Sequence, residues 1–191
     1  MIPADDALPV PAVGRRPVHL RRIECAGYVR DDGLFDIEGR LVDTKPYDLV
    51  LPERPLPAHE PIHQMTLRLA VDASFLIHEA EARTLDAPYG VCGRIAPDYA
   101  RLVGMRIEPG FNLTVKRMFR GTQGCSHITE LLPALATTAF QVIWSDTSNY
   151  DNRAGDSGRL RSSPLGGCHA LRLDGEVVLR HFRHLLPPGA G

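Results

Sequence analysis

Residues 63–83 carry the sequence feature that most constrains the fold, because their apolar and polar side chains alternate with a period of two. The positions that would share the apolar face of a strand are Met65, Leu67, Leu69 and Val71. Thr66, Arg68 and Ala70 would lie on the other face. Since successive side chains of a strand point to opposite faces, this pattern predicts a strand with one face against a core. Asp72-Ala73-Ser74 then predicts a turn into a returning strand over 75–83.

A second antiparallel pair is predicted nearer the N-terminus. Residues 18–28 are typical of a strand, Asp31-Asp32-Gly33 of a turn, and residues 35–41 again alternate between apolar and charged side chains. Five prolines in residues 46–61 exclude a central strand or a helix interior there, so this stretch is expected to be a connection. Asp174-Gly175 predicts a further hairpin, with a strand that begins at Cys168.

The main helix is predicted over 127–144, where apolar side chains recur with helical spacing. Pro133 interrupts its first part, so the regular helix either begins near Leu132 or is kinked there. Residues 97–104 predict a short helix, and residues 110–119 favour a helix over a strand. We therefore expect an α+β protein, in which an antiparallel sheet of hairpins packs against one main helix. An irregular arm (1–17) would precede a single domain (18–191) with a polar, mobile loop at 145–167.

Composition narrows the class of protein. The chain has 191 residues, of which 43% are hydrophobic, and its formal net charge is −1. This balance is typical of a soluble globular protein and gives no indication of nucleic-acid binding. The N-terminus lacks the basic and apolar regions of a signal peptide, and no apolar run is long enough to span a membrane. We expect a cytoplasmic protein whose four cysteines are reduced.

Residues 121–133 are the stretch most typical of a reactive site. They place Cys125, His127 and Glu130 where a glycine-marked turn leads into the main helix. A helix N-terminus offers unpaired N–H groups and a partial positive charge, which favour a thiolate. Thiolates and imidazoles are the ligands that zinc and iron prefer, so we predict a site for one of these two metals. The ligands would come from Cys125, His127, Cys92, Cys168, His169 and His63.

Two other types of chemistry remain open. Cys125 could act as a nucleophile if the turn brings His127 to it. Alternatively, Asp36 and Glu38 share one strand face at a separation that suits paired acid–base work, although alternating charge is also normal for an exposed strand face. Arginines 21, 22 and 30 would then hold an acidic substrate, unless they only pair with nearby acids.

Several motifs together resemble the bacterial domain-of-unknown-function family 2889. They are Arg-Arg-Ile at 21–23, Arg-Asp-Asp-Gly-Leu-Phe-Asp-Ile-Glu-Gly at 30–39, Asp-Thr-Lys at 43–45, Gly-Cys-Ser-His-Ile-Thr-Glu-Leu-Leu at 124–132 and Cys-His-Ala at 168–170. The likeness extends from about residue 19 to residue 185. This resemblance implies a family without implying a reaction.

The order of a second set of residues is similar to that of iron–sulfur cluster scaffold proteins. His63 precedes a strand pair, Cys92 follows it, and the pair Cys168-His169 comes near the end. That analogy favours a metal site at these positions. We therefore expect a zinc- or iron-dependent enzyme of hydrolase or lyase type, which acts on a small acidic or acyl substrate with Glu130, Glu38 or Asp36 moving protons. The alternatives are a non-catalytic metal or iron–sulfur carrier, a cysteine-nucleophile enzyme, and a small binding protein whose cysteines are buried.

Overall fold

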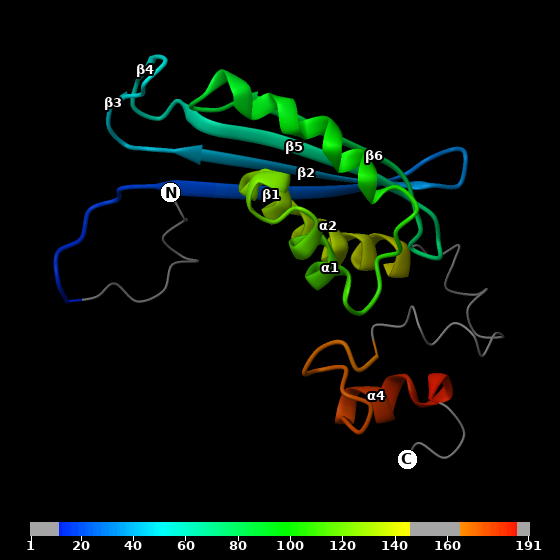
Figure 1. Ribbon diagram of the computed structural model, residues 1–191. Coiled ribbons are helices and arrows are strands. Elements are labelled where there is room, and N and C mark those ends of the chain that lie inside the picture. Colours follow the sequence, from blue (N-terminus) through cyan, green and yellow to red (C-terminus); the bar gives the residue numbers. More distant parts are fainter. Residues whose placement is uncertain (1–11, 146–164, 187–191) are drawn as a thin grey trace.

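The computed structural model describes residues 12–145 and 165–186 of the chain. Its centre is a four-stranded antiparallel sheet in the order β1-β2-β5-β6 (Figure 1). The strands are β1 (Leu20–Val29), β2 (Phe35–Thr44), β5 (Pro61–Val71) and β6 (Ile77–Asp86). The two hairpins predicted over 18–41 and 63–83 are therefore present, and β2 pairs with β5 to join them. Between them, β3 (Leu49–Val50) and β4 (Pro55–Leu56) form a separate two-stranded ladder within the proline-rich connection.

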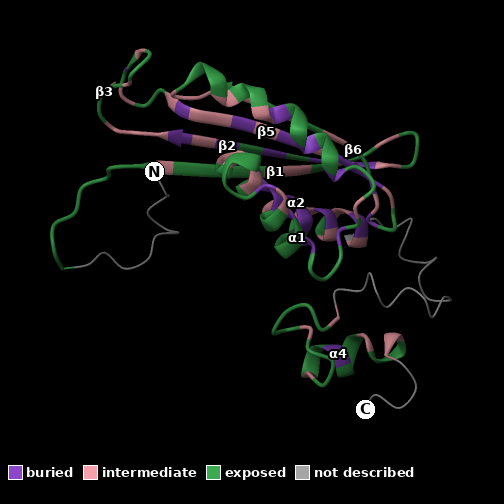
Figure 2. Cartoon of the chain, in the orientation of Figure 1, coloured by how far each residue is buried: buried purple, intermediate pink, exposed green. Residues whose placement is uncertain are grey.

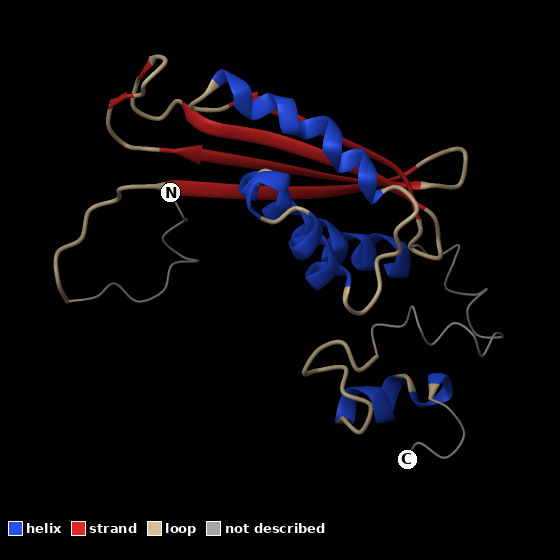
Figure 3. Ribbon diagram, viewed as in Figure 1, coloured by secondary structure: helices blue, strands red, loops and turns tan. Residues whose placement is uncertain are grey.

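The helices of the described chain come after β6 in the sequence (Figure 3). The 3-10 helix η2 (Gly90–Leu102) follows β6, and α1 (Phe111–Met118) and η3 (Gly121–Gln123) lead to the main helix α2 (Ser126–Ser145). Beyond residue 164 lie α4 (Glu176–His181) and the short 3-10 helix η6 (Arg183–Leu185). The fold is α+β, as the sequence predicts. None of the described helices combines the length and apolar character needed to cross a bilayer.

The core lies on one face of the sheet. The odd-numbered positions are buried throughout β2 and from Met65 to Val71 of β5. Ile37, Leu41, Met65, Leu67 and Leu69 are all at 1% exposure or less. Helix α2 packs directly on this face, because Gly39 lies against Leu131 and Leu135 and Gly27 lies against Val142. Tyr99 of η2 and Phe119 after α1 stack on one another and complete the same core. Figure 2 shows this burial concentrated in β2, β5 and the helices beside them.

The even-numbered face of the sheet carries ion pairs in place of an apolar core. Arg68 donates to Asp36 at 3.0 Å and to Glu79 at 2.9 Å, and Arg30 also pairs with both carboxylates. Glu38 is exposed on the same face. Asp36 is thus paired by arginines, which matches the ordinary solvated strand face considered from the sequence.

Helix α2 begins at Ser126, so Pro133 lies inside it and does not mark its start. The predicted helix at 110–119 is confirmed as α1. Cys92, which follows the strand pair of residues 63–83, lies in η2. The hairpin predicted at Asp174-Gly175 is wrong, because Gly175 precedes α4.

Local physical chemistry explains the helix at 176–181. Gly175 has φ −86°, so it does not adopt the positive φ of a tight hairpin turn. Glu176 in the first turn of α4 accepts a hydrogen bond from Arg180 at 2.6 Å, an i,i+4 pair that favours a helix. Residues 168–173, which would have supplied the partner strand, form turns. The polar loop predicted at 145–167 lies mostly outside the described residues.

Candidate functional site

A polar row closes one end of the buried sheet face. Within the sheet, Arg21 of β1 lies directly opposite Asp43 of β2, and Asp43 lies directly opposite His63 of β5. The next row along the same face is apolar and consists of Ile23, Leu41 and Met65. The register of β2 on β5 shifts between Asp43 and Thr44, directly beside this row. Irregularities of this kind commonly redirect side chains next to functional sites.

Asp43 is the buried centre of this row, since its side chain is only 1% exposed. Arg21 donates from Nε to Oδ1 at 2.8 Å and from Nη2 to Oδ2 at 2.7 Å, which is a bidentate pair. His19 Nε2 lies 3.2 Å from Oδ1. Burial pushes the pKa of Asp43 upward, but the hydrogen bonds and charge of Arg21 outweigh it, so the pKa lies below its ordinary value. Asp43 is therefore a carboxylate at neutral pH.

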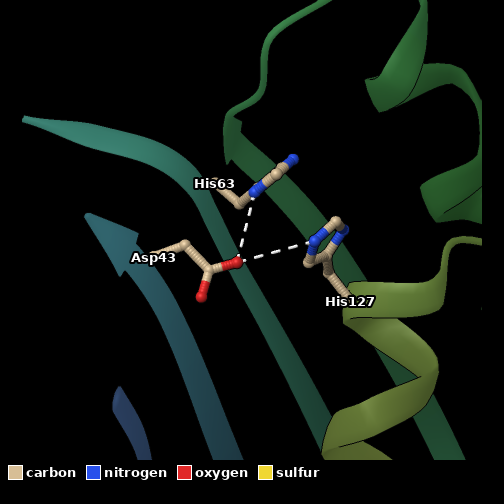
Figure 4. A group of neighbouring side chains, drawn as sticks. All are labelled: Asp43, His63 and His127. Atoms are coloured by element: carbon tan, nitrogen blue, oxygen red, sulfur yellow. Dashed lines mark hydrogen bonds and ion pairs between the residues drawn. The ribbon is translucent and has the colours of Figure 1, made fainter. Parts of the chain in front are cut away.

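Two histidine rings face Oδ2 of this carboxylate (Figure 4). His63 Nδ1 lies 3.2 Å from Oδ2, and Nε2 of His127, from the first turn of α2, lies 3.5 Å from it. The two rings stack with their centroids 3.7 Å apart. Burial lowers the pKa of both histidines, and for His127 burial and the neighbouring His63 lower it to about 4. Both imidazoles are therefore neutral at pH 7.

The three side chains have the composition and spacing of a metal site. One ligand atom from each of Asp43, His63 and His127 lies within 4.8 Å of the other two, and among the described residues they form the one such group of three. Two ligands bound to one ion at 2.0–2.1 Å are about 3.0–3.4 Å apart, depending on the geometry. The measured separations from Asp43 Oδ2, 3.2 Å and 3.5 Å, are close to that range. Neutral imidazoles and a carboxylate are the protonation states that a metal requires.

Helix α2 positions His127 through an anchored N-terminus. The carbonyl of Cys125 accepts the N–H of Thr129 at 2.9 Å, so Cys125 is the residue that caps this end of the helix. The phenol of buried Tyr99 donates to the Cys125 carbonyl at 2.8 Å and accepts the Cys125 N–H at 3.0 Å. These contacts fix Cys125 Sγ at 3.8 Å from His127 Nδ1. The turn thus brings together two residues that a regular helix would direct apart.

A family model described as a protein of unknown function (DUF2889) matches residues 19–141, more than half of the chain. The chain belongs to this family. No curated protein and no solved structure matches it. The DUF2889 match contains every residue of the polar row and the first turn of α2, whereas Cys168 and His169 lie beyond it. Membership gives no reaction, so the chemistry has to be argued from the site.

The structure brings together only part of the ligand set predicted from the sequence. His63 and His127 belong to the group around Asp43, and Cys125 is next to His127. Cys92 in η2 and Cys168 in an exposed turn belong to no group of three potential ligands among the described residues, and neither does His169. Of the predicted carboxylates, exposed Glu130 follows His127 by three residues in α2, while Asp36 and Glu38 lie on the opposite face of the sheet.

Sequence reasoning missed Asp43 as a site residue, and the signal that would have found it is its position in β2. Asp43 continues the odd-numbered series of Ile37 and Leu41 toward the core, where an unpaired carboxylate would be costly. A charged residue at an alternating position that is otherwise apolar in a strand therefore indicates a partner of opposite charge near the core. Arg21 continues the series of Ile23 and Cys25 in the same way.

Proposed function

We propose that this protein is a metal-dependent enzyme, of hydrolase or lyase type, in which Asp43, His63 and His127 hold one zinc or iron ion. The observation that carries the proposal is the convergence of two neutral imidazoles on one oxygen of a buried carboxylate, at separations suited to a shared ion. Two histidines and one carboxylate are a common set for catalytic zinc and for non-haem iron(II). Three protein ligands also leave a coordination position for substrate.

The surrounding residues support such a site. Arg21 holds both oxygens of Asp43 and His19 lies beside Oδ1, while Oδ2 also faces the two rings. Holding a ligand in place in this way is the role of the groups that orient metal ligands. The bound ion would polarise a carbonyl or activate water. Glu130 is exposed, and its charge acts on both Arg21 and His127, so it is the carboxylate we assign to proton transfer.

The substrate class follows from Arg21. Its guanidinium uses Nε and Nη2 on Asp43, and 37% of the side chain remains exposed. A guanidinium has five N–H donors, so others remain for an incoming carboxylate. A small acidic or acyl molecule is therefore the substrate we propose.

Metal analysis tests the proposal directly. We expect purified protein, or protein loaded with zinc or with iron(II) under anaerobic conditions, to hold about one ion per chain. His63→Ala and His127→Ala should each lose it. His78→Ala is the matched control, because His78 also lies beside a carboxylate, Asp72, at 2.8 Å but on the surface. Folded wild-type protein that holds no metal after loading with either ion would refute the metal site.

A second candidate, a cysteine nucleophile, is favoured by one specific contact. Cys125 Sγ lies 3.8 Å from Nδ1 of His127, and Nε2 of the same ring lies 3.5 Å from Asp43. This is the order of nucleophile, base and orienting carboxylate found in cysteine enzymes. In this alternative Asp43 would orient the ring of His127, and no ion would be needed.

Alkylation separates the two candidates. If Cys125 is the nucleophile, iodoacetamide should modify it in metal-stripped protein much faster than it modifies exposed Cys168, and His127→Gln should remove the difference. If metal chemistry is correct, activity should disappear on chelation and survive Cys125→Ser. Equal alkylation rates for Cys125 in wild-type and His127→Gln protein would contradict the nucleophile.

A further inference from the structure

The outer edge of β1 has no strand partner among the described residues. β1 is the first strand of the sheet, and no described strand pairs with its outer side (Figure 1). It is ten residues long, and Ile23, Tyr28 and Val29 are 40%, 52% and 65% exposed. A long edge strand presents a row of unpaired backbone groups that another strand can bind.

The opposite edge of the sheet, formed by β6, is partly covered by another segment of the chain. At the start of β6, Ile77 donates to the carbonyl of Met105 at 2.9 Å and accepts from Gly104 at 2.8 Å. Leu76 and Arg106 form an antiparallel bridge beside it. Residues 103–107 thus cover the beginning of the β6 edge. Among the described residues, β1 has no such cover, so it is the edge available for pairing.

We propose that two copies of this chain pair through β1 in antiparallel orientation, with Ile23 opposite Ile23 of the second copy. In a two-fold arrangement that continues the sheet, each residue must lie opposite one of the same parity, because opposite residues share a face. Centring the pair on Ile23 puts Arg22 opposite Glu24 of the second copy, twice by symmetry. Opposite charges directly across a strand pair are stabilising.

The neighbouring registers are disfavoured by the same rule. Centring the pair one position earlier puts Arg22 opposite itself, and one position later puts Glu24 opposite itself. Like charges directly opposite destabilise a strand pair. Centring on Cys25 avoids repulsion but gives no opposite charges, since Arg22 then faces Tyr28. Charge complementarity therefore selects both the second copy as the partner and Ile23 as the centre.

Pairing would also bring the second copy to the candidate site. Arg21, which holds Asp43, lies opposite Cys25 of the second copy in this register. Arg22 and Glu24 lie on the even-numbered face, away from Asp43 and the two histidines. Substitutions at these two positions therefore test the dimer without touching the proposed ligands.

Sedimentation velocity over a range of concentrations, combined with charge reversal, tests the proposal. Wild-type protein should dimerise, and Arg22→Glu and Glu24→Arg should each weaken the dimer at least tenfold. When the two variants are mixed, each Arg should again face a Glu, so the mixture should form heterodimers of wild-type strength. Arg83→Glu is the control, because Arg83 is an exposed residue of β6 on the same face of the sheet. This substitution should leave the strength of the dimer unchanged.

A cross-link fixes the register. Cα atoms directly opposite in an antiparallel pair are about 4.5–5.5 Å apart, within reach of a disulfide. In a Cys25→Ser background, Ile23→Cys should form a disulfide-linked dimer on mild oxidation, whereas Val29→Cys should not. Wild-type protein that stays monomeric at its highest soluble concentration, or mixed variants that fail to associate, would overturn the proposal. Efficient cross-linking of wild-type Cys25 to itself would overturn the register.

Discussion

Asp43 is the residue whose burial most directly determines the properties of the site, and its pair with Arg21 has a matched control in the same chain. Arg172 and Asp174 form a bidentate pair of the same distances, 2.8 and 2.7 Å, but the Asp174 side chain is 74% exposed, against 1% for Asp43. We predict that Asp43→Asn lowers the free energy of unfolding by about 2–3 kcal/mol, because it leaves buried donors without a charged partner. Asp174→Asn should have little effect, because solvent already screens that pair.

Urea unfolding of both variants beside the wild type checks this prediction. A similar small loss in the two variants would show that burial does not strengthen the Arg21–Asp43 pair, and the description of Asp43 as the centre of the site would need revision.

The low pKa of His127 predicts a specific pH dependence of stability. The pKa is about 4 in the folded protein and 6.5 ordinarily, so the unfolded chain binds the proton more tightly. Stability is then fully present above pH 6.5 and falls as the pH drops toward 4. Between pH 7 and pH 5 we expect metal-stripped protein to lose about 2 kcal/mol from this group. His63, whose pKa burial also lowers, should add a loss of the same sign.

Unfolding experiments in the presence of a chelator at the two pH values measure the effect. His127→Gln should show a clearly smaller loss between pH 7 and pH 5. An unchanged loss in that variant would mean that other groups carry the pH dependence.

At the same scale, the sequence put both histidines and Cys125 among the predicted ligands but gave no basis for choosing among the thiols. His127 and Cys125 were chosen because they lie at the start of a strongly periodic helix. Asp43 was missed because its partners, Arg21 and His63, lie 22 and 20 residues away, and only strand register brings them together. Separation along the sequence does not reveal which residues lie opposite one another across strands. The odd-numbered position of Asp43, on the buried side of β2, does indicate that it needs a partner.

At the scale of elements, the contact between α2 and β1 depends on Gly27. A Cβ at this position would lie 2.0 Å from Cγ2 of Val142, and a β-branched side chain has little freedom to move aside. We predict that Gly27→Ala destabilises the protein by about 1–3 kcal/mol through overpacking. Val142→Ala should create room for the new methyl group, so the double variant should be less destabilised than the sum of the two single variants.

A double-mutant cycle of unfolding free energies measures this coupling. Additive effects would show that β1 and α2 are not pressed together at Gly27. Gly33→Ala is not a suitable control, because Gly33 has φ +84°, a conformation in which alanine is strained whatever the space around it. Gly14→Ala is suitable, since nothing lies near its added Cβ.

Elements were predicted well wherever their period was uninterrupted, as in β2 and β5. The prediction failed at residues 174–182, where a two-residue turn signal outweighed the helix-favouring pair of Glu176 and Arg180. It was also incomplete at Pro133, which lies within α2 although proline removes a backbone donor. Local signals of this kind compete, and the packing that decides between them is not visible in the sequence.

At the scale of the whole molecule, the sheet, α1, α2 and η2 share one hydrophobic cluster, whereas Val178, the buried residue of α4, is not part of it. We predict that a chain ending at residue 164 keeps the sheet and α2 and unfolds with nearly the same free energy as the full chain. It should also keep full metal stoichiometry, although it lacks Cys168 and His169. Circular dichroism, urea unfolding and metal analysis test this together. Loss of metal in a folded, truncated protein would restore those two residues as ligands.

The polar row has a consequence for how the protein folds. Its three members, Arg21, Asp43 and His63, come from three strands, and a one-residue slip in any strand would turn its member to the opposite face. The second histidine of the site, His127, comes from a helix and lies 64 residues after His63. The site therefore forms only when the strand alignment is correct and α2 is docked. An ion that binds there would distinguish the native pairing from every misaligned one, and in a refolding experiment its uptake would mark the last step.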